Sequence, residues 1–180
     1  MNEKQIRFQI KDERVAVFGY PALEGREGTL VGDGIASFRG EGRRNYEWYL
    51  ANTVTGTIRK FSTSDGRLLV DDSDIDYNAI ASECEYGLEY AKTKRMNYAT
   101  MGYWDFFKDG FCAISWMLYP DGVYFADSDG FGVEDNDEEV VYAIIDTELT
   151  IVEPFRPLEH INATLEGVRQ RKRETITNNK

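Results

Sequence analysis

The chain has 180 residues, 42% of them apolar, and a formal net charge of −11. This length and composition are typical of one globular domain, and no apolar run approaches the 18 or more residues of a membrane span. Nucleic acid and anionic membrane are disfavoured as direct partners, because phosphate contacts require Lys or Arg. The first residues, Met1-Asn2-Glu3-Lys4-Gln5, lack the apolar segment of a signal peptide, which predicts a cytoplasmic protein.

Alternating apolar and polar residues predict a series of β-hairpins in the first third of the chain. The runs 5–10 and 14–18 form the first expected hairpin. A second is expected over 29–38, where the turn Gly32-Asp33-Gly34 tolerates positive φ. Three further strands are expected at 46–50, 57–62 and 68–70. These elements predict an antiparallel meander.

A helix is predicted over about 75–94, because apolar residues at Ile80, Cys84, Leu88 and Ala91 recur on one helical face. Ser73 or Asp74 is the expected N-cap, since a short side-chain oxygen accepts hydrogen bonds from the free N–H groups of the first turn.

The next segment, 96–109, is dense in aromatic residues, including Trp104. Burial in the core is the favoured interpretation, because large aromatic side chains contribute much of a small domain's buried area. Trp is also a frequent anchor of protein interfaces, so a recognition surface is the alternative.

The last third of the chain is expected to complete the sheet. Strands are predicted at 111–119 and 123–126 as a pair around the turn Pro120-Asp121-Gly122, and then at 140–145 and 149–152. Pro154 and Pro157 are expected to end the sheet, and a final helix is predicted over about 158–173. The sequence thus predicts a single α+β domain over 1–174, mainly antiparallel sheet with a central and a C-terminal helix, followed by a disordered tail at 175–180.

Negative charge is concentrated in the middle of the chain. Residues 65–155 hold 5 basic and 21 acidic residues, a balance of −16, whereas 1–64 hold 10 and 8 and 156–180 hold 6 and 3. Asp109–Phe155 alone contains twelve acidic residues and no Lys or Arg. Like charges about 4 Å apart repel by roughly 1 kcal/mol even in water, so solvent, a cation or a basic partner must compensate.

The favoured interpretation is a non-enzymatic binding protein without a cofactor, whose partner is a basic protein. In composition the chain is similar to small acidic inhibitors of nucleases, including immunity proteins and phage anti-defence proteins. Such an inhibitor occupies the basic groove in which a nuclease or other nucleic-acid enzyme binds phosphates. The expected contact residues are Asp127, Asp129, Glu134, Asp135, Asp137, Glu138, Glu139 and Trp104.

Two alternatives also depend on carboxylates. Calcium or another hard cation takes oxygen ligands, and the candidates are Asp127, Asp129, Asp135 and Asp137. An EF-hand does not fit, because Phe125 and Asn136 would occupy its first and last ligand positions. A carboxylate-dependent hydrolase is the other alternative.

The sequence offers little for nucleophilic catalysis or transition-metal binding. His160 is the single histidine, and a general base needs partners placed around it, so a solvated or helix-end histidine is the favoured interpretation. Cys84 and Cys112 lack CxxC spacing, which disfavours a zinc site and a disulfide and predicts two buried thiols.

Overall fold

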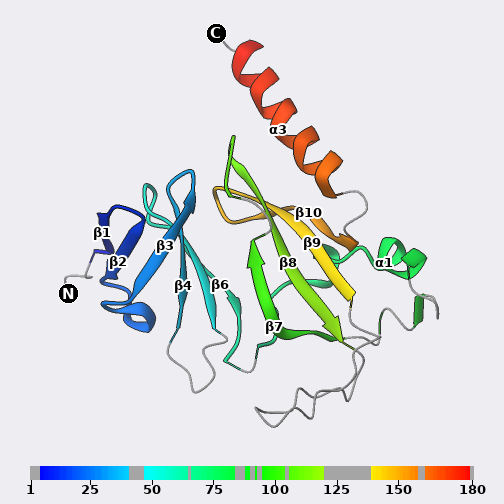
Figure 1. The fold of residues 1–180 in the computed structure, drawn as a ribbon, viewed down its shortest axis with the longest axis horizontal. Helices are drawn as coiled ribbons and strands as arrows, with labels where there is room; N and C mark the ends of the chain where they lie inside the picture. The colour runs from blue at the N-terminus through cyan, green and yellow to red at the C-terminus, as the bar shows by residue number, and fades with distance from the viewer. Residues whose placement is uncertain are drawn as a thin grey trace.

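Two antiparallel sheets share one hydrophobic core and make up most of the protein (Figure 1). The computed structural model describes residues 5–40, 47–64, 66–83, 88–89, 92, 95–103, 106–119, 139–157 and 161–178. At residues 83, 95–103, 117–119 and 139 it describes the backbone alone. The predicted α+β class, mainly antiparallel sheet in a single domain, is confirmed.

The first sheet is a six-stranded meander in which every strand pairs with the next one along the chain. Its strands are β1 (Arg7–Lys11), β2 (Arg14–Phe18), β3 (Glu27–Gly32), β4 (Ile35–Arg39), β5 (Trp48–Asn52) and β6 (Ile58–Ser62). Both predicted hairpins are present, and the turn between β3 and β4 uses positive φ at Gly32, Asp33 and Gly34. The strand predicted at 68–70 is wrong, because Leu68 forms only an isolated bridge with Ser62.

The second sheet is a four-stranded meander with the order β10-β9-β8-β7. Its strands are β7 (Arg95–Tyr103), β8 (Phe111–Tyr119), β9 (Glu139–Asp146) and β10 (Ile151–Pro157). Both edges of β8 are occupied, by β7 and β9, while residues 123–126, its predicted partner, lie outside the described residues. Strand β7 was not predicted.

Pro154 and Pro157 were expected to end the sheet, and that prediction is correct for Pro157, the last residue of β10, but wrong for Pro154, which lies inside the strand. Strand β10 is at the edge of its sheet, where proline is tolerated since an edge strand leaves one row of backbone groups outside the ladder. The pairing of β10 with β9 is also interrupted by two register shifts, on either side of Glu153.

Helix α1 (Tyr77–Glu83) begins later than predicted. Its first turn is capped by Asp76, whose Oδ1 accepts a hydrogen bond of 3.0 Å from the backbone N–H of Ala79. The predicted caps, Ser73 and Asp74, are therefore wrong. Asp74 instead forms a capping box with Asp71 around the short 3-10 helix η2 (Asp72–Asp74).

Beyond α1, helical backbone is described at Leu88, Glu89 and Lys92, within the predicted span; the remaining residues of 84–94 lie outside the described part.

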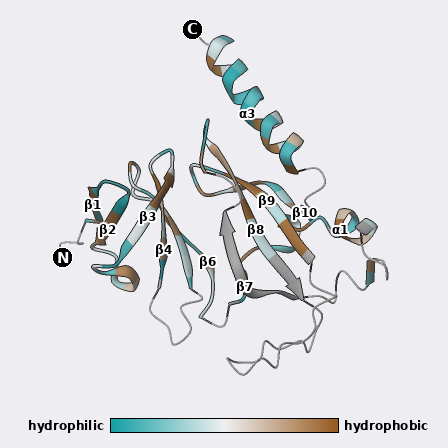
Figure 2. Ribbon diagram, in the orientation of Figure 1, coloured by the Kyte–Doolittle hydropathy of each residue, from teal (hydrophilic) through white to brown (hydrophobic). Residues whose placement is uncertain are grey.

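Helix α3 (Ile161–Asn178) continues beyond its predicted end at Arg173. Residues 175–178, expected in a disordered tail, are helical. The Thr175 and Thr177 hydroxyls donate hydrogen bonds to the carbonyls of Arg171 and Arg173, one turn earlier. In Figure 1 the last turns of α3 project past the sheets, and Figure 2 shows that most of the helix is hydrophilic.

The main core lies between the two sheets. The first sheet contributes Val31, Trp48, Leu50 and Phe61, and the second contributes Ile114, Trp116, Val141, Ala143 and Phe155. Because side chains alternate along a strand, β5 also supplies Tyr49 and Ala51 to a separate cluster on the other face of the first sheet. The first sheet is therefore buried on both faces around β5.

Helix α3 packs on the second sheet away from the main core. Its apolar residues Ile161, Leu165 and Val168 form a third cluster with Ala113, Tyr142 and Ile144 of β8 and β9. The molecule is consequently layered in the order first sheet, second sheet, α3. No helix in the described part of the chain is long and apolar enough to cross a membrane.

Candidate functional site

The predicted acidic surface belongs to the connection between β8 and β9. Glu139 is the first residue of β9, where only its backbone is described. The other predicted contact residues lie outside the described residues: Asp127, Asp129, Glu134, Asp135, Asp137, Glu138 and Trp104. The same is true of the four acids considered as cation ligands. Among the described residues, no group of three or more His, Cys, Asp or Glu side chains is placed to hold a metal ion.

The anchors of this acidic connection are described. Strands β8 and β9 pair without interruption from Phe111 with Asp146 to Leu118 with Glu139. The chain therefore leaves the sheet after Tyr119 and returns to it at Glu139, on the strand that pairs with β8. Between these points, residues 120–138 contain seven acidic residues and no Lys or Arg. We call residues 120–138 the acidic connection.

The residues considered for nucleophilic chemistry are only partly described. Cys112 is a buried thiol, as predicted, and its S–H group donates to the carbonyl of Ala113 at 3.3 Å. Cys84 and His160 lie outside the described residues.

Polar side chains of the first sheet hold the turn between β9 and β10. Asn52, 6% exposed, donates to the carbonyl of Thr147 at 2.9 Å, while its Oδ1 accepts from the N–H groups of Val54 and Thr55. Arg59 donates to the carbonyl of Leu149 at 2.6 Å. These bonds fix the end of the second sheet against the first.

The loop before β8 also joins the two sheets. The N–H of Phe107 donates to the carbonyl of Val31 at 2.6 Å, and the N–H of Gly110 donates to Oδ2 of Asp33 at 2.8 Å. Gly32 has a φ of 108°, and a Cβ there would lie 2.2 Å from the carbonyl oxygen of Phe107. Only glycine allows this close approach.

The basic half of α3 binds this same loop. Arg169 is 5% exposed, and its guanidinium donates to the carbonyls of Lys108, Phe106 and Phe111 at 3.0–3.1 Å. One turn later, Arg173 contacts Asp109 at 2.6 Å and Glu166 at 2.7 Å. The hydrogen bond from Arg173 lowers the pKa of Glu166 and in return raises the pKa of Arg173. Arg169 and Arg173 of α3 are thus both bound to groups of the same molecule.

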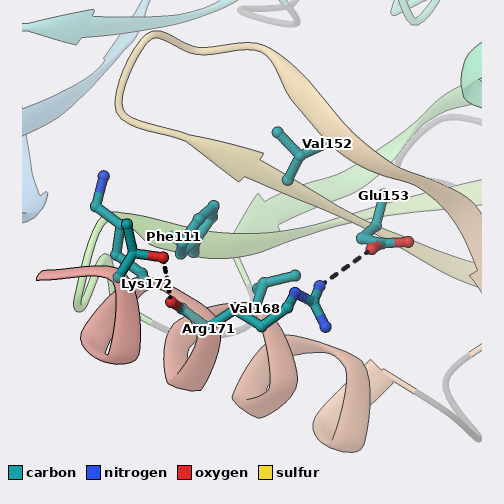
Figure 3. A pocket seen from close by; sticks show the side chains of 7 residues that line it. Phe111, Val152, Glu153, Val168, Arg171 and Lys172 are labelled. Atoms are coloured by element: carbon teal, nitrogen blue, oxygen red, sulfur yellow. Dashed lines mark hydrogen bonds and ion pairs between the residues drawn. The ribbon is translucent and has the colours of Figure 1, made fainter. Parts of the chain in front are cut away.

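A pocket of about 310 Å³ lies between α3 and β10 (Figure 3). Apolar side chains from three elements line it: Phe111 of β8, Val152 of β10 and Val168 of α3. Charged side chains also line it: Glu153, Arg171 and Lys172. Sequence reasoning missed this pocket, because it is formed by elements that are far apart along the chain.

Charge pairing in the pocket is uneven. Oε2 of Glu153 binds Nη2 of Arg156 at 2.5 Å, whereas Oε1 of the same residue lies 3.8 Å from Nη2 of Arg171. The Arg171 side chain is 66% exposed. Lys172 makes no ion pair with any residue that the structure describes. The pocket therefore has a locally positive rim on a strongly acidic protein.

Comparison with protein families, with curated proteins and with solved structures finds no match to this chain. Charge distribution and geometry are therefore the basis for a functional proposal.

Proposed function

We propose that this protein is a non-enzymatic binding protein that presents the acidic connection to a basic partner. The proposed partner is a nuclease or other nucleic-acid enzyme, inhibited because carboxylates occupy its phosphate-binding groove. One observation carries the proposal: seven acidic residues without a compensating Lys or Arg fall between two strands that are paired continuously up to Leu118 and Glu139.

The sheet is a firm attachment for such a segment. Strands β8 and β9 contribute Ile114, Trp116, Val141 and Ala143 to the main core, and all four are at most 2% exposed. Two fixed ends limit the conformational freedom of the residues between them, and less freedom lost on binding means higher affinity. Attachment to the sheet therefore favours the acidic connection as a contact segment.

The charge of the acidic connection supports a basic partner in two ways. A concentration of one sign of charge accelerates encounter with an oppositely charged groove and excludes acidic proteins. Pairing with Lys and Arg side chains also relieves the mutual repulsion of the carboxylates. Both effects weaken with salt, because the screening length falls from about 10 Å at 0.1 M to about 3 Å at 1 M.

The test is affinity capture from a nuclease-treated lysate of the source cells with three forms of the protein. One is unmodified, and one carries Asp127→Asn, Asp129→Asn, Asp135→Asn and Asp137→Asn. The matched control carries the same change in charge at four exposed glutamates on other elements: Glu13→Gln, Glu89→Gln, Glu148→Gln and Glu174→Gln.

The unmodified and control proteins should capture the same basic nucleic-acid enzyme at about 0.1 M salt and lose it at about 1 M. The Asp→Asn protein should bind this enzyme at least about tenfold more weakly, and purified unmodified protein should inhibit its activity. Equal binding by the Asp→Asn and control proteins would show that the acidic connection is not the contact surface. A captured enzyme that keeps full activity would refute inhibition.

A further inference from the structure

We propose that the pocket between α3 and β10 is a binding site for a small apolar group that carries a carboxylate. The apolar part would lie against Phe111, Val152 and Val168, which come from three different elements. Val152 is 41% exposed although it is an aliphatic residue on a strand beside a helix. A volume of about 310 Å³ lies at the lower end of the range for small-molecule sites.

The cations of the pocket supply the anion specificity. Arg169 and Arg173, on the same helix, are held by backbone carbonyls and by Asp109 and Glu166. Among the residues that the structure describes, Arg171 has only a long contact with Glu153, whose other oxygen already binds Arg156. The planar guanidinium of Arg171 can therefore donate two parallel hydrogen bonds to the carboxylate of a ligand. Lys172 adds a second positive charge.

The remaining polar groups favour a singly charged ligand. The hydroxyl of Thr175, which also lines the pocket, already donates to the carbonyl of Arg171 at 2.9 Å. The carboxylate of Glu153 faces the same space and repels additional negative charge. A monocarboxylate is thus better matched than a phosphate, which carries more charge at neutral pH.

This site is separate from the points at which the acidic connection joins the sheet. Strand β8 begins at the pocket with Phe111 and ends at Tyr119, where the acidic connection starts. At about 3.3 Å per residue, eight residues of strand separate them by roughly 26 Å. The two proposals therefore succeed or fail independently.

The test compares two probes of the same shape, 4-phenylbutyrate and the neutral 4-phenyl-1-butanol, by NMR titration of the ¹⁵N-labelled protein. We expect shifts concentrated at Phe111, Val152 and Val168, and about tenfold tighter binding of the carboxylate. In the R171Q/K172Q variant, binding of 4-phenylbutyrate should weaken about tenfold to match the alcohol, whose own binding should not change.

Two further variants separate charge from shape. K11Q/K92Q removes the same charge at exposed lysines of β1 and of the 88–92 region, and both probes should bind it as they bind the unmodified protein. V152T keeps the shape of the side chain and should weaken both probes by the same factor. Equal binding of acid and alcohol, a preference that survives in R171Q/K172Q, or shifts that avoid the pocket would overturn the proposal.

Discussion

Arg169 shows how one side chain of α3 determines where the whole helix lies. Three carbonyls, two from the loop before β8 and one from Phe111 at the start of β8, accept hydrogen bonds from its buried guanidinium. The same loop is bonded to β3 and to the turn after it, through Val31 and Asp33. A single cation therefore links the C-terminal helix to the junction of the two sheets.

We expect Arg169→Gln to lower the free energy of unfolding by about 2–3 kcal/mol, because the three carbonyls lose the charged group that donates hydrogen bonds to them. Arg169→Lys keeps the charge without the planar fork and should recover only part of the loss. Urea unfolding measures both. The matched control is Arg171→Gln, two residues away and exposed, for which about 0.5 kcal/mol or less is expected. Equal losses in the two glutamine variants would contradict the structural role of Arg169.

The sequence contained a signal for Arg169 that its basic neighbours obscured. Ile161, Leu165 and Val168 recur at helical spacing and share a face, and Arg169 lies one turn after Leu165 on that same side. Composition alone groups it with Arg171, Lys172 and Arg173 as a basic helix end. The three carbonyls that distinguish Arg169 come from a loop about sixty residues earlier, which no local pattern reveals.

The start of α1 illustrates the same difficulty for an element. Six residues, Asp71–Asp76, include five whose side chains favour helix caps, so composition cannot decide among them. The structure assigns Asp71 and Asp74 to η2 and Asp76 to α1.

Strand β7 was not predicted, for a different reason. Its sequence, RMNYATMGY, contains no Val or Ile and mixes strand-favouring Tyr and Thr with Asn, Ala and Gly, which are depleted in strands, so pairing with β8 decides its conformation.

Asp76→Ala should destabilise the protein by about 1 kcal/mol, since the N–H of Ala79 loses its acceptor. The control is Ser73→Ala, the cap expected from sequence, which should change stability by less than about 0.3 kcal/mol because Ser73 is exposed outside α1. Thermal and urea unfolding monitored by circular dichroism provide the comparison. A larger effect at Ser73 than at Asp76 would reverse the assignment.

For the whole molecule, the shared core matters more than either sheet. Leu50 of β5 and Ile114 of β8 are buried in the same cluster although they belong to different sheets. Neither sheet can exclude water from its inner face without the other.

Alternation and turn residues were enough to predict the hairpins, the α+β class and much of the strand content. Which faces meet depends on twist and long-range packing, which a pattern of period two does not encode.

We therefore expect one cooperative unfolding transition. Leu50→Ala in the first sheet and Ile114→Ala in the second should each lower the free energy of unfolding by about 2–5 kcal/mol. In both variants, urea curves followed by far-UV circular dichroism and by tryptophan fluorescence should coincide. A second transition, shifted by only one of the two substitutions, would show that the sheets unfold separately.

The meander order of both sheets also has a consequence for how the protein is made. Every strand pairs with a neighbour in the chain, so β1 to β6 can pair in turn as they leave the ribosome, without waiting for distant segments. Their inner face, with Val31, Trp48 and Leu50, stays uncovered until β8 to β10 have been synthesised. If synthesis pauses between residues 62 and 111, the first sheet is paired but its apolar inner face is exposed to solvent. Aggregation is then most favourable, and binding of a chaperone to the nascent chain would prevent it at this stage.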